Sequence, residues 1–120
     1  MRARRPAAAV LAAAAVLGAC GEDEGPVPNA RAERGRELIE QHGCGTCHVI
    51  GGVDGANGRV GPPLTNFKDN RLVGGQLQNT PENVVRWILE PRRFDPQTAM
   101  PDVGLTREQA MAVAEYLYTQ

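Results

Sequence analysis

The stretch that decides the fold is "QHGCGTCHVI", residues 41 to 50, in which Cys44, Cys47 and His48 form a C-x-x-C-H cluster among glycines. Two thiols and an imidazole at this spacing occur in thiol–disulfide redox pairs, in zinc sites, and in sites where a cofactor is attached to both thiols. The choice depends on the compartment of the cysteines and on the other ligands that the chain offers. The N-terminal sequence addresses the first question.

The N-terminus carries the pattern of a secretory signal. Residues 1–20, "MRARRPAAAVLAAAAVLGAC", begin with three arginines, continue through an apolar segment from Ala7 to Leu17, and end in small residues. The apolar segment is shorter than the roughly 20 residues that a membrane-spanning helix needs. We therefore expect a signal that is removed and not a retained transmembrane anchor.

The end of this signal, Leu17-Gly18-Ala19-Cys20, resembles the lipobox of bacterial lipoproteins, in which the cysteine becomes the lipidated first residue of the mature protein. The alternative is an ordinary cleavage site followed by an unrelated cysteine. Cys20 has no evident disulfide partner, because the other two cysteines belong to the C-x-x-C-H cluster. We predict a signal peptide at residues 1–19, lipidation of Cys20, and an extracytoplasmic or periplasmic protein that is lipid-anchored to a bacterial membrane.

The mature chain is expected to be one domain on a short tether. Residues 20–29 are acidic, contain glycine and proline, and have too few apolar residues to fold, so we predict a flexible tether there. Residues 30–120 suffice for a single core. Removal of the signal deletes three arginines and no acidic residue, so the formal charge falls from −1 to −4. With no basic run, we expect no nucleic-acid partner, and we expect a monomer.

Helical signals, and no alternating strand pattern, are found along residues 30–120. A helix is predicted over Ala30 to His42 with Gly43 after it, because apolar or small residues recur at helical spacing. Thr80 and Pro81 predict the start of a second helix, which Pro91 should end. A last helix should follow the capping box formed by Thr106 and Gln109. The fold class is therefore all-α, with three to five helices and long loops.

The composition leaves the core short of large side chains. Only five residues are aromatic and 14 are glycine. Residues 50–61 hold five glycines with Asp and Asn, a loop composition, and residues 91–104 are rich in turn-forming residues. Long loops of this kind need a reason to be ordered. A bound apolar group in the core would provide it.

In an exported chain, C-x-x-C-H is typical of covalent haem attachment, in which Cys44 and Cys47 form thioethers and His48 ligates the iron. A redox pair should open a helix within a strand–helix unit, which this sequence lacks. Zinc would need two further ligands, yet His42 is the one other histidine and Cys20 belongs to the signal. We therefore expect one haem c, which would also fill the thin core.

A second axial ligand could come from Met100, Met111 or His42. Met111 lies within the predicted last helix, where core packing is the simpler role. His42 is too close to His48 along the chain to cross easily to the other face of a haem. Met100 lies in a loop between Pro96 and Pro101, which hold it with little entropy left to lose. These considerations favour Met100 and leave the other two open.

Several motifs in fixed order resemble the class I monohaem cytochromes c. They cover residues 30–120 and comprise Cys44-x-x-Cys47-His48, Gly61-Pro62-x-Leu64, Asn79-Thr80-Pro81-Glu82-Asn83, Trp87, Pro91, Met100-Pro101 and Ala114-Glu115-Tyr116-Leu117. Within that family the chain is most similar to the cytochrome c domain of bacterial cytochrome c oxidase subunit II. The resemblance implies the class I cytochrome c fold wrapped around one covalent haem. It also implies that Gly35 meets an aromatic residue, Tyr116, where the first and last helices cross.

The same resemblance implies the roles of the site residues. His48 would be the proximal ligand and Met100 the distal ligand of the iron. Pro62 would offer its backbone carbonyl to the ring N–H of His48. Arg71 and Trp87 would lie near the haem propionates or the distal wall.

A haem with histidine and methionine ligands implies a one-electron carrier and not an enzyme. Its expected partners are a quinol:cytochrome c oxidoreductase or a dehydrogenase as donor, and a terminal oxidase as acceptor. Because no membrane anchor or copper domain precedes the cytochrome motifs, we expect a free-standing lipoprotein. A fixed electron-entry subunit of a larger oxidoreductase and a haem-based gas sensor are the alternatives.

Overall fold

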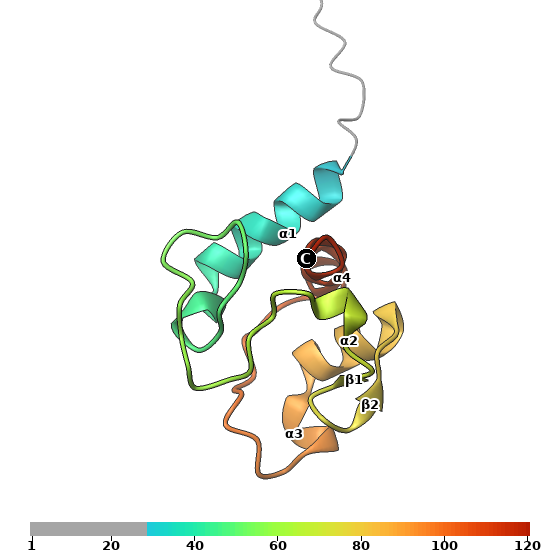
Figure 1. Cartoon of the computed structure of the whole chain (residues 1–120). Coiled ribbons are helices and arrows are strands. Elements are labelled where there is room, and N and C mark those ends of the chain that lie inside the picture. Colours follow the sequence, from blue (N-terminus) through green and yellow to red (C-terminus); the bar gives the residue numbers. More distant parts are fainter. Residues whose placement is uncertain (1–28) are drawn as a thin grey trace, which may run out of the picture.

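The computed structural model describes residues 29–120, so the predicted signal peptide, Cys20 and nearly all of the tether lie outside the described residues. The described part is mostly helical, as predicted (Figure 1). Its α-helices are α1 (Ala30–Gln41), α2 (Pro81–Leu89), α3 (Pro91–Phe94) and α4 (Arg107–Leu117). Two short 3₁₀ helices, η1 (Cys44–Thr46) and η2 (Phe67–Asp69), and two strands, β1 (Leu72–Val73) and β2 (Leu77–Gln78), complete the elements.

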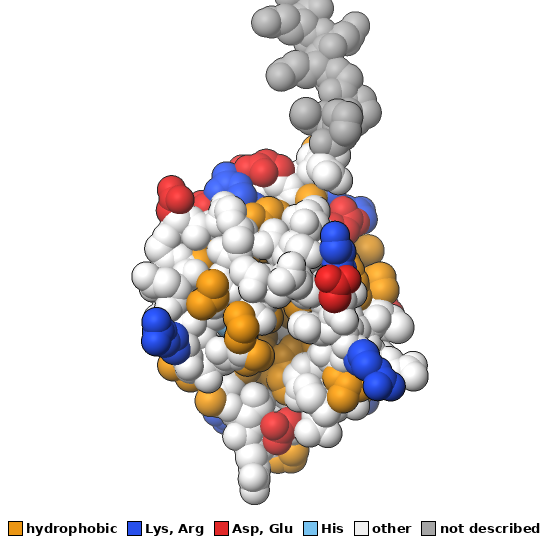
Figure 2. Space-filling model, viewed as in Figure 1, with side chains coloured by type: hydrophobic (Ala, Val, Ile, Leu, Met, Phe, Trp, Pro, Cys, Tyr) orange, Lys and Arg blue, Asp and Glu red, His pale blue; other side chains and the backbone are white. Residues whose placement is uncertain are grey.

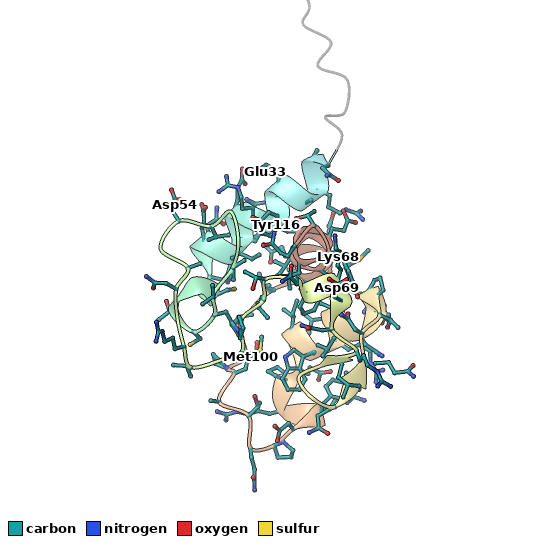
Figure 3. The ribbon with its side chains drawn as sticks, viewed as in Figure 1. Glu33, Asp54, Lys68, Asp69, Met100 and Tyr116 are labelled. Atoms are coloured by element: carbon teal, nitrogen blue, oxygen red, sulfur yellow. The ribbon has the colours of Figure 1, made fainter. Side chains whose placement is uncertain are left out.

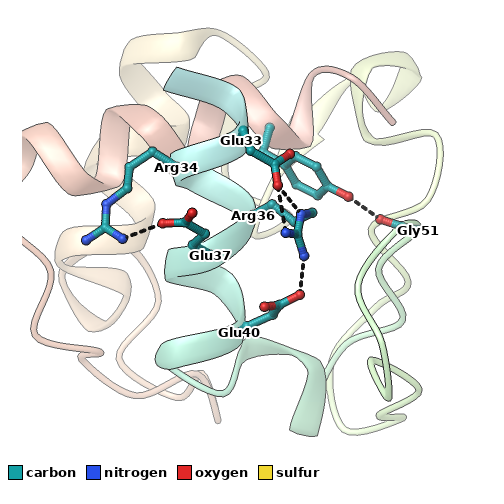
Figure 4. Close-up of polar contacts among 7 residues, drawn as sticks. Glu33, Arg34, Arg36, Glu37, Glu40 and Gly51 are labelled. Atoms are coloured by element: carbon teal, nitrogen blue, oxygen red, sulfur yellow. Dashed lines mark hydrogen bonds and ion pairs between the residues drawn. The ribbon is translucent and has the colours of Figure 1, made fainter. Parts of the chain in front are cut away.

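Helix α1 forms because one face is small and apolar, and it ends at Gln41, shortly before Gly43, whose φ of 68° is left-handed. Figure 1 shows α1 crossing α4. At this crossing a Cβ on Gly35 would lie 2.0 Å from the carbonyl oxygen of Ala112, so only glycine allows the approach. The atoms nearest to this Cβ therefore belong to the backbone of α4, at Ala112 and Val113. The Tyr116 hydroxyl donates a hydrogen bond to the Gly51 carbonyl at 2.6 Å (Figure 4).

The solvent face of α1 carries ion pairs one helical turn apart. Arg36 pairs with Glu33 and Glu40, and Arg34 pairs with Glu37 at 2.7 Å (Figure 4). Exposed pairs of this kind each add little to the stability of the protein. They support the helix and leave its apolar face to the core.

Helix α2 starts as its sequence predicts. The Thr80 hydroxyl accepts a hydrogen bond from the Asn83 N–H at 3.3 Å, and Pro81 occupies the first helical position. Its buried face includes Val84, Val85, Trp87 and Ile88. Pro91 follows the end of α2 and also opens the four-residue helix α3, in a segment whose composition predicts a loop. Proline suits a first helical position because its missing N–H has no partner there in any case.

The hairpin of β1 and β2 was not predicted. Leu72 pairs with Gln78 and Val73 with Leu77, so each strand is too short to show alternation. Gly74 and Gly75 make the turn with φ of 58° and 72°. Asn79 fastens the hairpin: its side-chain amide donates to the carbonyls of Phe67 and Asn70, and its oxygen accepts from the hydroxyl of Tyr118.

Helix α4 begins with the predicted capping box, in which Thr106 and Gln109 exchange hydrogen bonds of 2.9 and 3.2 Å. Its buried residues pack with those of α1 and α2 to form one core. No helix within residues 29–120 is long and apolar enough to cross a membrane.

Candidate haem site

The C-x-x-C-H motif begins in η1, directly after the left-handed Gly43 that ends α1. Backbone N–H groups of Cys47 and His48 both donate to the carbonyl of Cys44, at 3.2 and 3.1 Å. Both cysteines are free thiols, and partial burial raises the pKa of the Cys44 thiol. The motif therefore follows a helix, and does not open one after a strand as a redox pair would.

The ring of His48 is held by Gly61 and Pro62, which lie against it. Its Nδ1–H donates to the Pro62 carbonyl at 2.7 Å, so in the neutral ring Nε2 carries no proton and keeps its lone pair. A Cβ on Gly61 would lie 2.3 Å from Cε1 of the same ring. The backbone at Gly61 and Pro62 can therefore lie directly against His48 and set its orientation.

The glycine-rich loop closes over the motif from another side. The Gly58 N–H donates to the carbonyl of Gly45 at 3.0 Å, and a Cβ on Gly58 would lie 2.2 Å from the carbonyl oxygen of Thr46. A side chain at either contact would push the loop away. These glycines supply no side chain to the core, but they allow the backbone of the loop to approach the cysteine motif.

Met100 is half-buried and packs against the core, and Figure 3 places it near the middle of the face shown. The indole N–H of Trp87 donates to Met100 Sδ at 3.2 Å. Trp87 is itself covered by the hairpin turn, since a Cβ on Gly74 would lie 2.4 Å from its ring. The sulfur of Met100 therefore lies at a defined position, because Trp87 donates a hydrogen bond to it and the hairpin turn packs against Trp87.

The other candidate ligands lie elsewhere. Met111 is 36% exposed and lines a surface groove beside Val85 and Tyr118. His42 is the C-cap of α1, and its Nδ1–H donates to the Val103 carbonyl at 3.0 Å, a contact that no sequence pattern indicates. Arg71 is exposed, and within residues 29–120 its side chain has no hydrogen bond or ion pair. The structure thus brings Trp87 to Met100 and Pro62 to His48.

These residues fit a covalent haem. Two free thiols three residues apart, an imidazole with an available Nε2 and a positioned thioether are the donor set that a haem c takes. Figure 2 shows hydrophobic side chains gathered at the centre of the same face, with charged side chains around it. Partly buried hydrophobic residues available to cover such a group include Leu64, Leu77, Leu89, Phe94, Val103 and Leu105. Within the described range, three or more His, Cys, Asp or Glu side chains nowhere come together as a metal site.

Comparison with known proteins agrees with the assignment of these residues to a haem c site. The chain is 33% identical over 87 residues to cytochrome c oxidase subunit 2 of Alkalihalophilus pseudofirmus, covering 72% of this chain and 25% of that protein. It is 32% identical over 85 residues to cytochrome c oxidase subunit 2 of Bacillus sp. strain PS3, covering 68% of this chain and 24% of that protein. The chain thus spans about a quarter of the length of these relatives, and no solved structure matches it. Residues 32–120 match the family described as Cytochrome c, and the chain therefore belongs to the cytochrome c family.

Proposed function

We propose that this protein is a monohaem cytochrome c in which Cys44 and Cys47 hold the haem through thioethers and His48 and Met100 ligate its iron. The observation that carries the proposal is the preparation of both ligands: the Pro62 carbonyl frees Nε2 of His48, and the Trp87 indole fixes the sulfur of Met100. When bound, the haem supplies a reversible one-electron couple, whose potential is raised by methionine ligation.

The chain's own residues keep this chemistry to electron transfer. With both His48 and Met100 holding the iron, no protein-free coordination site would remain for a substrate. The hydrogen bonds to Pro62 and from Trp87 limit the movement of both ligands between the oxidised and reduced states. The protein accordingly acts as a carrier and not as an enzyme.

The proposed carrier works at an extracytoplasmic membrane surface, anchored through a lipid on Cys20. A tether confines it near its partners and raises their effective concentration. A quinol:cytochrome c oxidoreductase or a dehydrogenase would reduce it, and a terminal oxidase would oxidise it. The similarity to two cytochrome c oxidase subunits supports the choice of acceptor.

Two measurements test the haem. Acid–acetone extraction of the purified protein should leave the haem on the peptide, because thioether bonds survive it. The ferric protein should show the weak far-red absorption of a thioether-bound iron. Extractable haem would refute the attachment at Cys44 and Cys47. If the haem stays on the peptide, a redox titration of the protein should follow, because its potential narrows the list of donors and acceptors.

The lipid anchor has its own test. Intact-mass measurement of membrane-extracted protein should show a chain that begins at Cys20 with acyl chains attached. An unmodified Cys20, or cleavage at another residue, would remove the anchor from the proposal without affecting the haem.

A fixed electron-entry subunit is the second candidate, favoured by the similarity to cytochrome c oxidase subunit 2. Such a subunit should co-purify in fixed proportion with an oxidase from mildly solubilised membranes. A mobile carrier should separate from the oxidase at the first column.

A further inference from the structure

The segment that carries Met100 has few attachments to the rest of the domain. Within the described chain, residues 99–105 make no backbone–backbone hydrogen bond. Two hydrogen bonds join them to other elements: Trp87 donates to Met100 Sδ, and His42 donates to the Val103 carbonyl. Two further bonds are local: the Met100 N–H donates to the hydroxyl of Thr98, just before the segment, and the Gly104 N–H donates to the carboxylate of Asp102.

His42 occupies a position suited to holding this segment. It is the C-cap of α1, two residues before Cys44, and its partner lies 61 residues away, three residues after Met100. The bond therefore joins the start of the C-x-x-C-H motif to the Met100 segment. A carbonyl oxygen only accepts, so Nδ1 must carry the proton. Partial burial of the imidazole limits competition from water for this bond.

We propose that His42 is a positioning residue: its hydrogen bond to the Val103 carbonyl, here called the latch, holds residues 99–105 against the C-terminal end of α1. This bond sets how readily Met100 leaves the iron. The inference rests on the proposed function, because it takes Met100 as the distal ligand. Without the latch, Pro101 and the Trp87 bond would still restrain the segment, but its C-terminal half would have no side-chain hydrogen bond to another element. Met100 would then dissociate more often, and small external ligands would reach the iron faster.

The latch can be tested by the rate at which imidazole binds the purified ferric protein, at concentrations where opening of Met100 limits the rate. His42→Phe keeps a ring but removes the donor, and should bind imidazole about fivefold faster, the factor expected for the loss of one neutral hydrogen bond. His42→Asn places an amide N–H near the position of Nδ1 and should restore the wild-type rate. Gln41→Ala is the matched control, because Gln41 is the exposed neighbour and its side chain makes no hydrogen bond within the described chain.

Separate outcomes address the latch and the ligand assignment. If His42→Phe and His42→Asn bind imidazole at equal rates, or both match wild type, the latch is overturned while Met100 ligation stands. If Met100→Ala retains the far-red absorption, the ligand assignment fails regardless of His42. In the His42→Phe, Met100→Ala double variant the latch predicts no acceleration beyond Met100→Ala alone. A further acceleration there would mean that His42 shields the iron independently of Met100, contrary to the proposal.

Discussion

At the residue scale, the backbone does as much as the side chains to prepare the site. The backbone carbonyl of Pro62 fixes the tautomer of His48 by accepting its Nδ1–H. Gly61, which has no side chain, lets this backbone lie against the ring. Trp87 fixes the sulfur of Met100 in the same manner, through one N–H group. Each proposed ligand therefore has a partner that orients it.

Met100→Ala should remove the far-red absorption of the ferric protein, lower its redox potential and open the iron to carbon monoxide in the ferrous state. The reason is that alanine offers no atom to replace the thioether. Absorption spectra and a carbon monoxide titration check this, with Met111→Ala as the control, since Met111 lies on the outer face of α4. If Met111→Ala has these effects instead, the assignment of Met100 is wrong.

Trp87→Phe should lower the redox potential by about 40 mV, the one-electron equivalent of a hydrogen bond worth ~1 kcal/mol. The indole N–H withdraws electron density from the sulfur, which favours the ferrous iron, and phenylalanine keeps a ring while removing that donor. A redox titration of both proteins measures the difference. An unchanged potential would mean that the Trp87 bond holds Met100 without influencing the iron.

At the element scale, the short hairpin β1–β2 serves as the outer support of the site. It is fastened by Asn79, and its turn lies against the ring of Trp87 through Gly74. A chain of contacts therefore runs from the hairpin through Trp87 to Met100. Two strands of two residues each would have little stability alone, so the hairpin depends on these contacts.

Gly74→Ala and Gly75→Ala form a matched pair that tests this support. Both glycines have left-handed φ, so each substitution should cost roughly 1–2 kcal/mol of backbone strain. A Cβ on Gly75 would meet nothing within 4 Å, whereas one on Gly74 would lie 2.4 Å from the Trp87 ring. Gly74→Ala should therefore lower the free energy of unfolding further, by about 1–3 kcal/mol, and weaken the far-red absorption. Denaturant titrations that give equal losses for the two variants would contradict the contact.

At the scale of the whole molecule, the charges around the site are mixed and largely engaged. Arg93 pairs with Glu90, while the carboxylates of Asp95 and Asp102 accept hydrogen bonds from nearby backbone N–H groups. Lys68 is the one lysine in the chain. A molecule with such a surface has no strong single-sign field to steer a partner from a distance.

The rate of electron transfer to a terminal oxidase purified from the same membranes should therefore change by less than about tenfold between low and physiological salt concentration. Small apolar contacts, of the kind that serve transient redox encounters, would provide most of the docking, and the lipid anchor would maintain proximity. A stopped-flow series over ionic strength measures this with the lipidated protein and with a chain that starts after Cys20. A fall of several orders of magnitude would reveal a charged docking face.

The sequence by itself determined the local features: where α1 and α2 begin and end, where α4 begins, the identity of the cysteine motif, and the likeness to cytochromes c. These follow from capping residues, glycines and motif spacing, which act over a few neighbouring residues. Only the tertiary structure decided that Gly35 meets Ala112, that the hairpin covers Trp87 and that His42 reaches Val103. Each of these contacts joins residues distant in sequence, and none leaves a periodic pattern, because a single close approach or hydrogen bond depends on how whole elements pack.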